Sequence, residues 1–453
     1  MNILRTFILF LVSTFSLSAQ FYFNKNYDFE EQEDIFWAIE NHTGNQTVAI
    51  GITRSINLEN KITFSFLDGL GNQSRSIVYG EPLIQYRNVQ GILDENALVV
   101  SATFVENGQE DFVHAFLMKM SLFGEVLWTQ KTGLEDRRNV TKRHIATSDE
   151  GYLLVGYTDD FSSGNLERIA YAVKVDSLGT LLWEKTYGTA DSLESIFDVV
   201  ETDDNHYLFL GQQSDGDNSA EHGQNQDIWL MKADQNGEVV WEKKHGDIFF
   251  QEGNDIQRVE GGYVIVGTTH EENVVFSRPF GWVLKVDENG EYLWERKYAG
   301  ISYTGKHWRD NFREVRETKN GDLIIVGLSD NFNTTVTNMG ILVKMTADGD
   351  SLWTKAYHNS FYQHVFFDFE LAEDGGFNIC GWTDYGVESG TRDGWILKVD
   401  SLGNTCQPAN CDSIFTTSIH YDITTHYPTH FYPNPAQNRV TFQHRLPKGK
   451  EAV

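Results

Sequence analysis

Residues 214–227, with the sequence SDGDNSAEHGQNQD, hold the densest group of potential metal ligands in the chain. The oxygen donors are Asp215, Asp217, Asn218 and Glu221. Calcium takes about six to eight such ligands, and glycines let a loop curl around an ion. The segment does not follow the full pattern of a calcium-binding loop. Ca²⁺ as a cofactor therefore stays open beside the favoured interpretation, a solvated loop that holds no metal.

Aromatic side chains form a second candidate site, a ligand-binding surface. They are Tyr86, Phe249, Phe250, Tyr303, His307, Trp308, Phe361 and Tyr362, with Arg309 and Asp310 as polar neighbours. We expect these residues on long connections that vary from one repeat to the next. Aromatic side chains on variable loops over a rigid scaffold are typical of a binding surface. The alternative is that the rings fold back and plug a central channel.

Catalytic motifs are not evident in the sequence. No Ser–His–Asp order, HExxH motif or phosphate-binding glycine loop stands out. An enzyme of this fold would need acid and base residues from its innermost strands, and Asp198, His307 and Asp368 are near suitable places. We assign no catalytic residue, and we favour a binding protein over an enzyme.

The charge and the first residues of the chain indicate an exported protein. The net charge of −29 over 453 residues argues against nucleic acid as a partner, because phosphates attract Lys and Arg. Residues 1–19 have the pattern of a secretory signal: Arg5 precedes the apolar run TFILFLVSTF, and small residues precede Gln20. We expect cleavage close to Ala19 and no membrane-spanning segment in the mature chain.

Three cysteines occur in the chain. Cys406 and Cys411 flank Pro408, and in an exported protein we expect them to close a small disulfide loop. Cys380 lies in the apolar run FNICGW and is predicted to be a buried thiol.

The segment KVDSLGTLLWEKTYG, residues 174–188, is the unit on which the rest of the chain is built. A turn from Asp176 to Gly179 precedes the strand that carries Trp183. The Trp recurs every 53–59 residues, at Trp128, Trp183, Trp241, Trp294 and Trp353. Asp and Gly are turn residues, and one Asp per turn cannot complete a calcium site. We predict that the Trp side chains have a structural role and pack between neighbouring repeats.

Apolar runs that end in Gly, such as EGYLLVG and GGYVIVG, mark a second position in each repeat. Each repeat then holds four strand-length segments, A to D, without helical periodicity. This pattern is typical of β-propeller blades. We predict an all-β, seven-bladed propeller over residues 20–411, followed by a linker over residues 412–430. A different β-repeat, or a ring of six or eight blades, is the alternative.

The last repeat lacks its own D strand, because the chain reaches Cys406 and Pro408 after the turn at Asp400. The N-terminal segment FYFNKNYDF aligns with the D strand LLWEKTYGT. We therefore predict that Phe21–Tyr27 is the outer strand of the last blade and closes the ring.

Near the C-terminus, Tyr432–Ala436 (YPNPA) followed by Asn438–Phe442 resembles the start of a type A C-terminal sorting domain of the type IX secretion system of Bacteroidetes. The resemblance covers residues 431–453, and the family's later Gly-rich turn and basic end are missing, so we expect an incomplete domain. It implies the type IX secretion machinery as a partner and a secreted or cell-surface location.

The repeats themselves resemble two groups of proteins. The turn-and-Trp unit is similar to the tryptophan-docking repeat of quinoprotein-type propellers, which implies a structural Trp. The adjacent Cys–Cys pair and the eighth repeat of those enzymes are missing here, so a quinone cofactor is not expected. Residues 214–246 are also similar to repeats of Bacteroidetes surface propellers.

The leading hypothesis is a secreted or surface-attached propeller that binds a protein or a glycan through the face of its B–C and D–A connections. A polysaccharide hydrolase or lyase with a site in the central channel is one alternative. A purely structural adhesion module is the other.

Overall fold

The computed structural model describes sixteen segments of the chain. They are residues 22–28, 33–43, 46–54, 59–106, 113–135, 137–160, 167–188, 193–214, 226–246, 250–270, 279–298, 309–330, 338–358, 363–384, 392–405 and 415–418. All regular structure in these segments is β-strand. No helix of the described part is long and apolar enough to span a bilayer.

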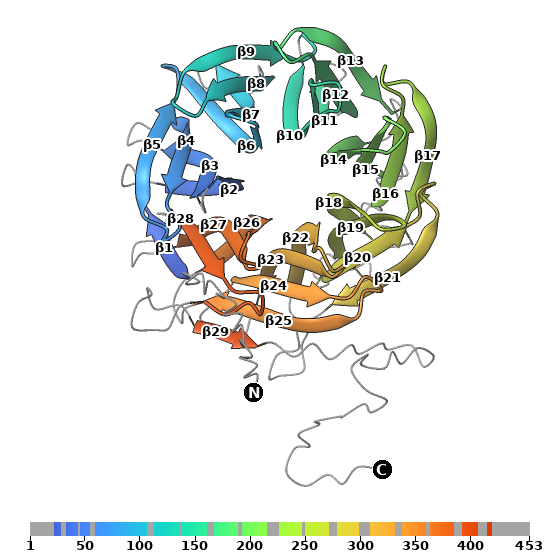
Figure 1. The fold of residues 1–453 in the computed structure, drawn as a ribbon. Coiled ribbons are helices and arrows are strands. Elements are labelled where there is room, and N and C mark those ends of the chain that lie inside the picture. The colour runs from blue at the N-terminus through green and yellow to red at the C-terminus, as the bar shows by residue number, and fades with distance from the viewer. Residues whose placement is uncertain are drawn as a thin grey trace, which may run out of the picture.

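The strands form antiparallel units of four, ordered A to D from the ring axis outward (Figure 1). The A strands are β2 (Glu33–His42), β6 (Ile84–Asp94), β10 (Arg138–Ala146), β14 (Glu194–Glu201), β18 (Gln251–Val259), β22 (Arg309–Glu317) and β26 (His364–Leu371). The B strands are β3 (Gln46–Arg54), β7 (Ala97–Glu106), β11 (Tyr152–Asp160), β15 (Tyr207–Ser214), β19 (Gly262–Thr269), β23 (Leu323–Asp330) and β27 (Phe377–Asp384).

The outer half of each unit carries the predicted turn and Trp. The C strands are β4 (Asn60–Leu67), β8 (Val113–Ser121), β12 (Glu167–Val175), β16 (Gln226–Ala233), β20 (Phe280–Val286), β24 (Met339–Met345) and β28 (Arg392–Val399). The D strands are β5 (Gln73–Tyr79), β9 (Val126–Thr132), β13 (Leu181–Tyr187), β17 (Val239–His245), β21 (Tyr292–Tyr298), β25 (Ser351–His358) and, from the N-terminus, β1 (Phe23–Tyr27). The prediction of an all-β chain with four-stranded repeats is confirmed.

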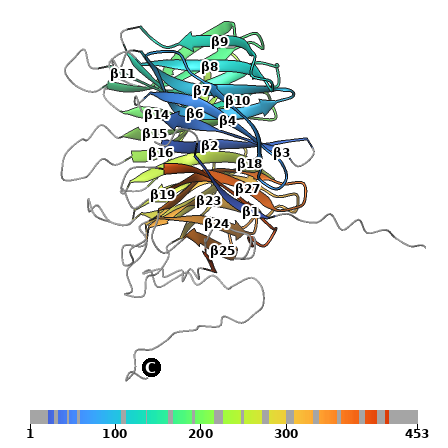
Figure 2. The same ribbon diagram turned by 90° about the vertical axis from the view of Figure 1, so that its left-hand side faces the viewer.

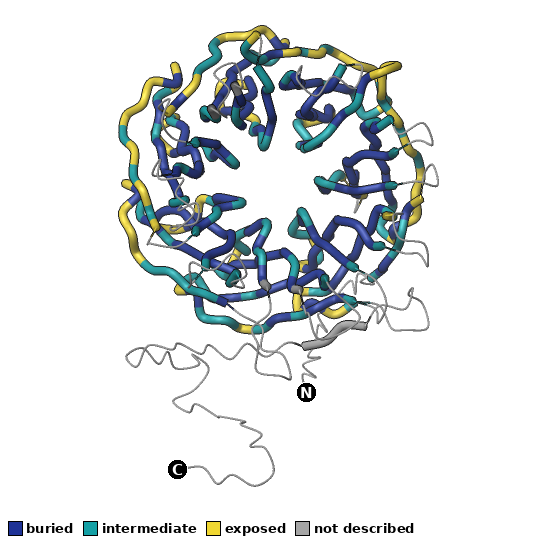
Figure 3. Tube along the Cα trace, turned by 180° about the vertical axis from the view of Figure 1, so that it is seen from behind, coloured by how far each residue is buried: buried dark blue, intermediate teal, exposed yellow. Residues whose placement is uncertain are grey.

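The units stand side by side in a ring, and their strands run across its thickness (Figures 1 and 2). Two of the sheets contain eight strands, because single parallel residue pairs join neighbouring units at Glu33 with Arg392 and at Arg138 with Val113. Burial follows the radius: the A, B and C strands are mostly buried, whereas the D strands on the rim are the most exposed (Figure 3).

The N-terminal strand joins the last repeat, as predicted. β1 pairs antiparallel with β28, with Phe23 opposite Lys398 and Tyr27 opposite Gly394. The indole N–H of Trp395 donates a 2.6 Å hydrogen bond to Asn24 Oδ1. One further strand, β29 (Phe415–Ser418), pairs with β25. This strand lies inside the segment predicted to be a linker, so that part of the segment does have regular structure.

The Asp-x-x-Gly turns and the Trp side chains join each repeat to the next. Asp176 Oδ1 accepts the N–H groups of Leu178 and Thr180, and Gly179 has φ +79°. A Cβ at Gly179 would lie only 2.7 Å from the ring of Trp128, so the turn needs a glycine. The indole N–H of Trp128 donates to the carbonyl oxygen of Ser177 (3.1 Å).

The same joint recurs around the ring. Each later Trp ring lies against the turn glycine of the following repeat, in the pairs Trp183–Gly237, Trp241–Gly290, Trp294–Gly349 and Trp353–Gly403. In the structure, these Trp rings thus lie between neighbouring repeats. Cys380 is a buried free thiol, and burial raises its pKa. The predicted signal segment, Cys406, Cys411 and residues 431–453 lie outside the described residues.

Candidate functional site

Every A strand contains a β-bulge, where an extra residue interrupts its pairing with the B strand. The interruptions fall at Trp37, Asn88–Val89, Lys142, Phe197, Asn254, Arg313 and Phe367. A bulge bends a strand and re-aims the side chains around it, and bulges are common next to functional sites. Two groups of side chains result. One lies at the bulges, and the other follows them one to three positions further along the strand.

The first group follows the bulges, and we call it the carboxylate–arginine layer. It consists of Arg143, Asp198, Asp255, Glu314, Arg316 and Asp368. Three of its carboxylates accept backbone N–H groups of the next repeat at 2.9 Å: Asp198 from Ile256, Asp255 from Val315 and Asp368 from Ile39. The last of these bonds links the final repeat to the first. The layer therefore fastens neighbouring A strands to one another.

Arg143 is the centre of this layer. Its guanidinium lies 3.2 Å from Asp198, 2.9 Å from Asp255 and 2.7 Å from Glu314, so one side chain from β10 reaches three further repeats. Arg316 forms an ion pair with Glu314. The layer is a structural network, because its charged groups already have partners. Its carboxyl groups also make it a potential acid–base site.

Burial and the surplus of carboxylates shift the pKa values in this layer. Burial, with the charge of Glu314, raises the pKa of Asp255 and Asp368 well above the ordinary value. Burial also acts to raise the pKa of Glu314, but the guanidinium groups of Arg143 and Arg316 outweigh it and hold this pKa below the usual range.

A cavity of about 280 Å³ lies beside the layer, toward the ends of the A strands and the A–B turns. Glu40 lines it, and burial together with the neighbouring charge of Glu370 raises the pKa of Glu40 to about 8. Burial raises the pKa of Glu370 to about 7. Two carboxyl groups that hold protons near neutral pH are capable of acid catalysis in principle.

The second group occupies the bulges, and we call it the bulge layer: Trp37, Lys142, Phe197, Arg313 and Phe367. Along each A strand it precedes the carboxylate–arginine layer, so it lies on the side where the D–A connections enter. The rings of Trp37 and Phe367 are 4.1 Å apart, and the Arg313 guanidinium lies 5.8 Å from Phe367. The Lys142 ammonium lies 5.3 Å from the ring of Phe197. Cations and aromatic faces thus meet across neighbouring repeats.

Tyr157 and Arg168 extend the bulge layer from β11 and β12. The ring of Tyr157 lies 5.6 Å from the Lys142 ammonium and 4.0 Å from the Arg168 guanidinium. Burial lowers the pKa of Lys142, and although the Glu252 carboxylate opposes this, Arg168 and Arg313 add to it. Burial raises the pKa of Tyr157.

Two donors of the bulge layer lack acceptors within the part of the chain that the structure describes. The indole N–H of Trp37 and the Nε–H of Arg313 are buried and make no hydrogen bond there. Such donors are rare in folded proteins, because an unpaired buried donor costs about 1–3 kcal/mol. A ligand with hydroxyl or carboxylate oxygens is one source of the missing acceptors.

The structure describes only two of the eight predicted ligand-binding residues. Tyr86 is a correction: it lies in β6 instead of a connection, has 0% of its surface exposed, and packs on Phe104 and Phe116. A ring with no exposed surface cannot contact a ligand. Phe250 is half-buried at the start of β18, with its ring 5.4 Å from His270. The remaining six lie outside the described residues: Phe249, Tyr303, His307, Trp308, Phe361 and Tyr362.

The acid–base and metal candidates are placed as follows. Asp198 and Asp368 line the same cavity, whereas His307 lies outside the described residues. The four residues of the loop that could bind calcium, Asp215, Asp217, Asn218 and Glu221, also lie outside them. Among the residues that are described, no group of three or more His, Cys, Asp or Glu has the arrangement of a metal site.

The bulge layer was not predicted from the sequence. The available signal was a break in alternation, since each A strand carries two adjacent side chains that both belong to the inner face, as in Phe197–Asp198 and Phe367–Asp368. In the sequence of a single strand, such a pair is only one break in the alternation of a short apolar segment, and it does not by itself indicate a site.

Comparisons with known proteins reveal a similarity in fold and none in sequence family. Neither the scan against protein-family models nor the search of curated proteins found a match. Among solved structures, the polysaccharide lyase Uly1 is similar with a TM-score of 0.50 and 11% identity, over 81% of this chain and 90% of that chain. The β-propeller domain of the Trilobed protease from Pyrococcus furiosus has a TM-score of 0.44 and 9% identity, over 83% and 97%.

An α-L-arabinanase from Penicillium chrysogenum has a TM-score of 0.43 and 8% identity, over 84% of this chain and 98% of that chain. The chain's own four-stranded antiparallel units, arranged around one axis, are the architecture of a β-propeller. The fold is a β-propeller. At these identities the likeness shows architecture and not activity.

Proposed function

We propose that the chain is a seven-bladed propeller that binds an anionic glycan at the bulge layer. In this proposal, each unit of strands A to D is one blade, and β1 completes the last blade beside β28. The ligand approaches from the side of the D–A and B–C connections. The solved propellers of similar fold that are named as glycan-active enzymes make a carbohydrate ligand the natural class to test.

One observation carries this proposal: cations collect in the bulge layer of a strongly acidic chain. The chain has a net charge of −29, yet Lys142 and Arg313 lie among aromatic rings at the inner strands. Arg168 lies beside them on β12, in an ion pair with Asp159 (2.8 Å). Cations that lack an ion-paired carboxylate among the described residues, as Lys142 and Arg313 do, favour a ligand with negative charge. Aromatic faces suit the C–H face of a sugar ring, and the unpaired donors of Trp37 and Arg313 suit its oxygens.

The experiment is a binding assay with matched variants. Isothermal titration calorimetry should give saturable binding of polyuronates, such as alginate or polygalacturonate oligosaccharides, and at least about tenfold weaker binding of neutral arabinan oligosaccharides. Lys142→Met and Arg313→Met should each weaken uronate binding by about tenfold or more. Arg258→Met, which removes a cation exposed elsewhere, is the control and should leave it unchanged. Equal affinity for neutral and acidic oligosaccharides would contradict the proposal.

A second candidate, polysaccharide cleavage by elimination, has its own supporting observation. Lys142 has a lowered pKa and lies beside Tyr157 and Arg168. A lowered pKa makes it easier for the amine to lose its proton and then to remove the proton next to a uronate carboxylate. A guanidinium such as that of Arg168, which also pairs with Asp159, can stabilise that carboxylate, and a tyrosine can protonate the leaving oxygen. Ultraviolet absorbance of an unsaturated uronate product tests this candidate. Binding without any such product would leave the chain as a binding protein.

We further propose that the protein acts outside the cell. The support is the secretory pattern of residues 1–19 and the YPNPA segment near the C-terminus. Fractionation of the native host should find the processed chain at the cell surface or in the medium. Retention of an unprocessed chain inside the cell would contradict this localisation.

A further inference from the structure

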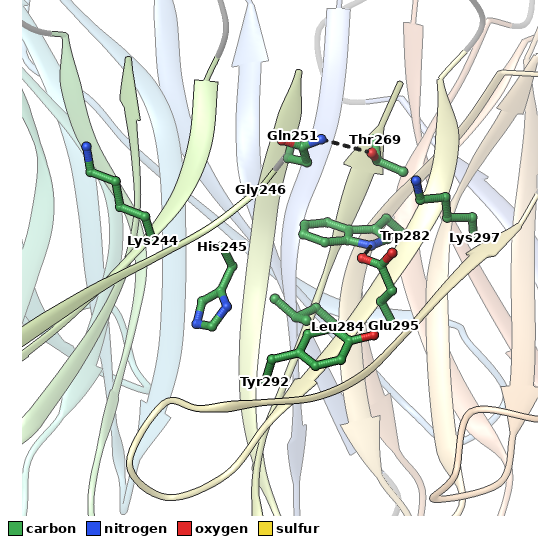
Figure 4. Close-up of a pocket in the computed structure, with 10 residues that line it drawn as sticks. All are labelled: Lys244, His245, Gly246, Gln251, Thr269, Trp282, Leu284, Tyr292, Glu295 and Lys297. Carbon is green, nitrogen blue, oxygen red and sulfur yellow. Dashed lines mark hydrogen bonds between the residues drawn. The ribbon is translucent and has the colours of Figure 1, made fainter. Parts of the chain in front are cut away.

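A second cavity, of about 320 Å³, lies between β17 of one unit and β18, β20 and β21 of the next (Figure 4). It shares no lining residue with the bulge layer or with the carboxylate–arginine layer. Its volume lies at the lower end of the range for small-molecule sites. The cavity therefore suits a small ligand, of the size of one sugar ring.

The fixed charge at the centre of this cavity is the carboxylate of Glu295 (Figure 4). One of its oxygens accepts the indole N–H of Trp282 at 3.1 Å, and Trp282 is only 2% exposed, so this hydrogen bond holds the carboxylate in place. Glu295 forms no ion pair within the part of the chain that the structure describes. Its second oxygen can therefore accept hydrogen bonds from a ligand.

Further acceptors lie at the end of the cavity next to Gly246. A Cβ at Gly246 would lie 2.0 Å from Oδ1 of Asp227 and 2.9 Å from Oε1 of Gln251, so the glycine lets both oxygens come close to the chain. Thr269, whose hydroxyl oxygen lies 3.4 Å from the side-chain nitrogen of Gln251, lines the same end. The polar groups around the cavity thus include several oxygens that suit a ligand rich in hydrogen-bond donors.

His245 adds an acceptor of another kind. Burial lowers its pKa, although the hydrogen bond to Gly290 opposes this shift, so the ring is neutral at pH 7. Its Nε2 donates to the carbonyl oxygen of Gly290 at 2.9 Å. In a neutral imidazole the other nitrogen then carries no hydrogen, so Nδ1 is an acceptor.

The lysines nearby do not turn this cavity into a site for anions. Lys244 and His245 are neighbours in β17, so their side chains point to opposite faces of the strand, and Lys244 points away from the cavity (Figure 4). Lys297 lines the cavity but already takes part in another interaction. The strongly acidic chain, with its net charge of −29, also attracts cations.

Apolar surface lies beside the Glu295 carboxylate. Figure 4 shows the ring of Tyr292 and the side chain of Leu284 there, and Tyr292 is 56% exposed. An ammonium group is attracted both by a carboxylate and by the face of an aromatic ring. The C–H face of a sugar suits the same apolar surface.

We infer that this cavity binds a primary ammonium group carried by a small polar ring, of which an amino sugar is the simplest example. The ammonium group lies against Glu295, the hydroxyls donate to the acceptors near Gly246 and to His245, and the C–H face of the ring packs on Tyr292. The inference does not rest on glycan binding at the bulge layer, because the two sites share no lining residue.

The test uses D-glucosamine as the probe, with sugars of the same ring that lack the charge. At about pH 6.5, where the amine is protonated, calorimetry on the wild-type chain should show saturable binding in the millimolar range or tighter. N-acetyl-D-glucosamine and D-glucose should bind at least about tenfold more weakly. Nα-acetyl-L-lysinamide, which has the ammonium group but no sugar ring, should bind at least about threefold more weakly than glucosamine.

Matched variants locate the binding. Glu295→Gln keeps an oxygen for the hydrogen bond from Trp282 but removes the charge, and it should weaken glucosamine binding by about tenfold or more. Glu242→Gln is the control, because Glu242 accepts the indole N–H of Trp229 at the same 3.1 Å in the preceding unit but is exposed. It should leave glucosamine binding unchanged.

A second variant keeps the test decisive if Glu295→Gln misfolds. Tyr292→Ser changes an exposed side chain and should weaken glucosamine binding by about threefold or more. Lys142→Met should not affect glucosamine, which separates this site from the bulge layer. Equal affinity for glucosamine and any of the three comparison ligands, or glucosamine binding that survives both Glu295→Gln and Tyr292→Ser, would overturn the inference.

Discussion

The joints on the outer half of the ring and the bulges on its inner strands are both repeated, but in opposite ways. At the joints the residue types recur: a turn Asp, a glycine with positive φ and a Trp, as in Asp234, Gly237 and Trp183. At the bulges only the backbone recurs, while the side chain changes from Trp37 to Lys142 in different repeats. A repeated side chain indicates packing that every interface needs, whereas a repeated backbone with varied side chains provides a frame for recognition.

The interface that contains His245, at the end of β17, adds an intermediate case. It keeps the joint, since Trp241 still lies against Gly290, but His245 stands where Tyr187, Tyr298 and Tyr357 stand at three other interfaces. A residue beside a joint can thus vary while the joint is kept, because neighbouring units are held by several independent contacts.

The largest effect on stability is expected where the inner strands are fastened. Arg143→Met should lower the free energy of unfolding by about 3–5 kcal/mol, because Asp198, Asp255 and Glu314 would lose a shared buried cation. Chemical denaturation measures the change. Arg258→Met removes an exposed ion pair with Asp203 and should cost less than about 1 kcal/mol. Similar losses for both variants would show that the carboxylate–arginine layer does not hold the ring together.

An outer joint should contribute less than the inner network. Trp183→Ala removes a half-buried ring and its hydrogen bond to Gln235, and it should lower the free energy of unfolding by about 2–3 kcal/mol. Leu182→Ala, at an exposed position of the same strand, should change it by no more than about 0.5 kcal/mol. An equal response to the two substitutions would contradict the structural role of the Trp.

The protonated carboxyl groups predict how stability depends on pH. Glu40 and Glu370 have pKa values of about 8 and about 7 in the fold, above the ordinary 4.5, so the folded chain binds more protons than the unfolded chain. Their stabilising contribution is complete below pH 4.5 and is lost progressively as the pH rises through 7–8, by several kcal/mol, since one unit of pKa difference corresponds to about 1.4 kcal/mol. Denaturant titrations across this window measure the slope. Glu40→Gln should flatten it, and Glu260→Gln, at an exposed turn, should not.

The smallest effect on stability is expected in the bulge layer. Lys142→Met and Arg313→Met should change the free energy of unfolding by less than about 1 kcal/mol, because apolar side chains of similar length replace partly desolvated cations. Glycan affinity should fall in the same variants, and wild-type affinity should fall as salt rises from 50 to 500 mM, roughly, because salt screens ion pairs. Unfolding of either variant at room temperature would instead assign these cations to the scaffold.

The repeated features were predictable from the sequence, because each of them recurs at a regular spacing along the chain. The Trp series located the joints, and the alignment of Phe23 with the Trp position placed β1 beside β28. Tyr86 was misplaced because one apolar segment between turns can be a connection or a strand start, and its burial depends on Phe104 and Phe116 from other strands. The bulge layer depends on which strands surround the axis, so its cations and rings converge only after the ring has formed.

The pairing of β1 with β28 also determines when the fold can be completed. Asn24 and Trp395 are 371 positions apart, and ribosomes make the first of them long before the second. The early strand must therefore remain unpaired, or pair elsewhere, until almost the whole propeller has been synthesised. Contacts this distant along a chain slow folding, and an unpaired strand invites association with other chains. The closing strand thus makes completion of the ring a late, all-or-none step in the folding of each molecule.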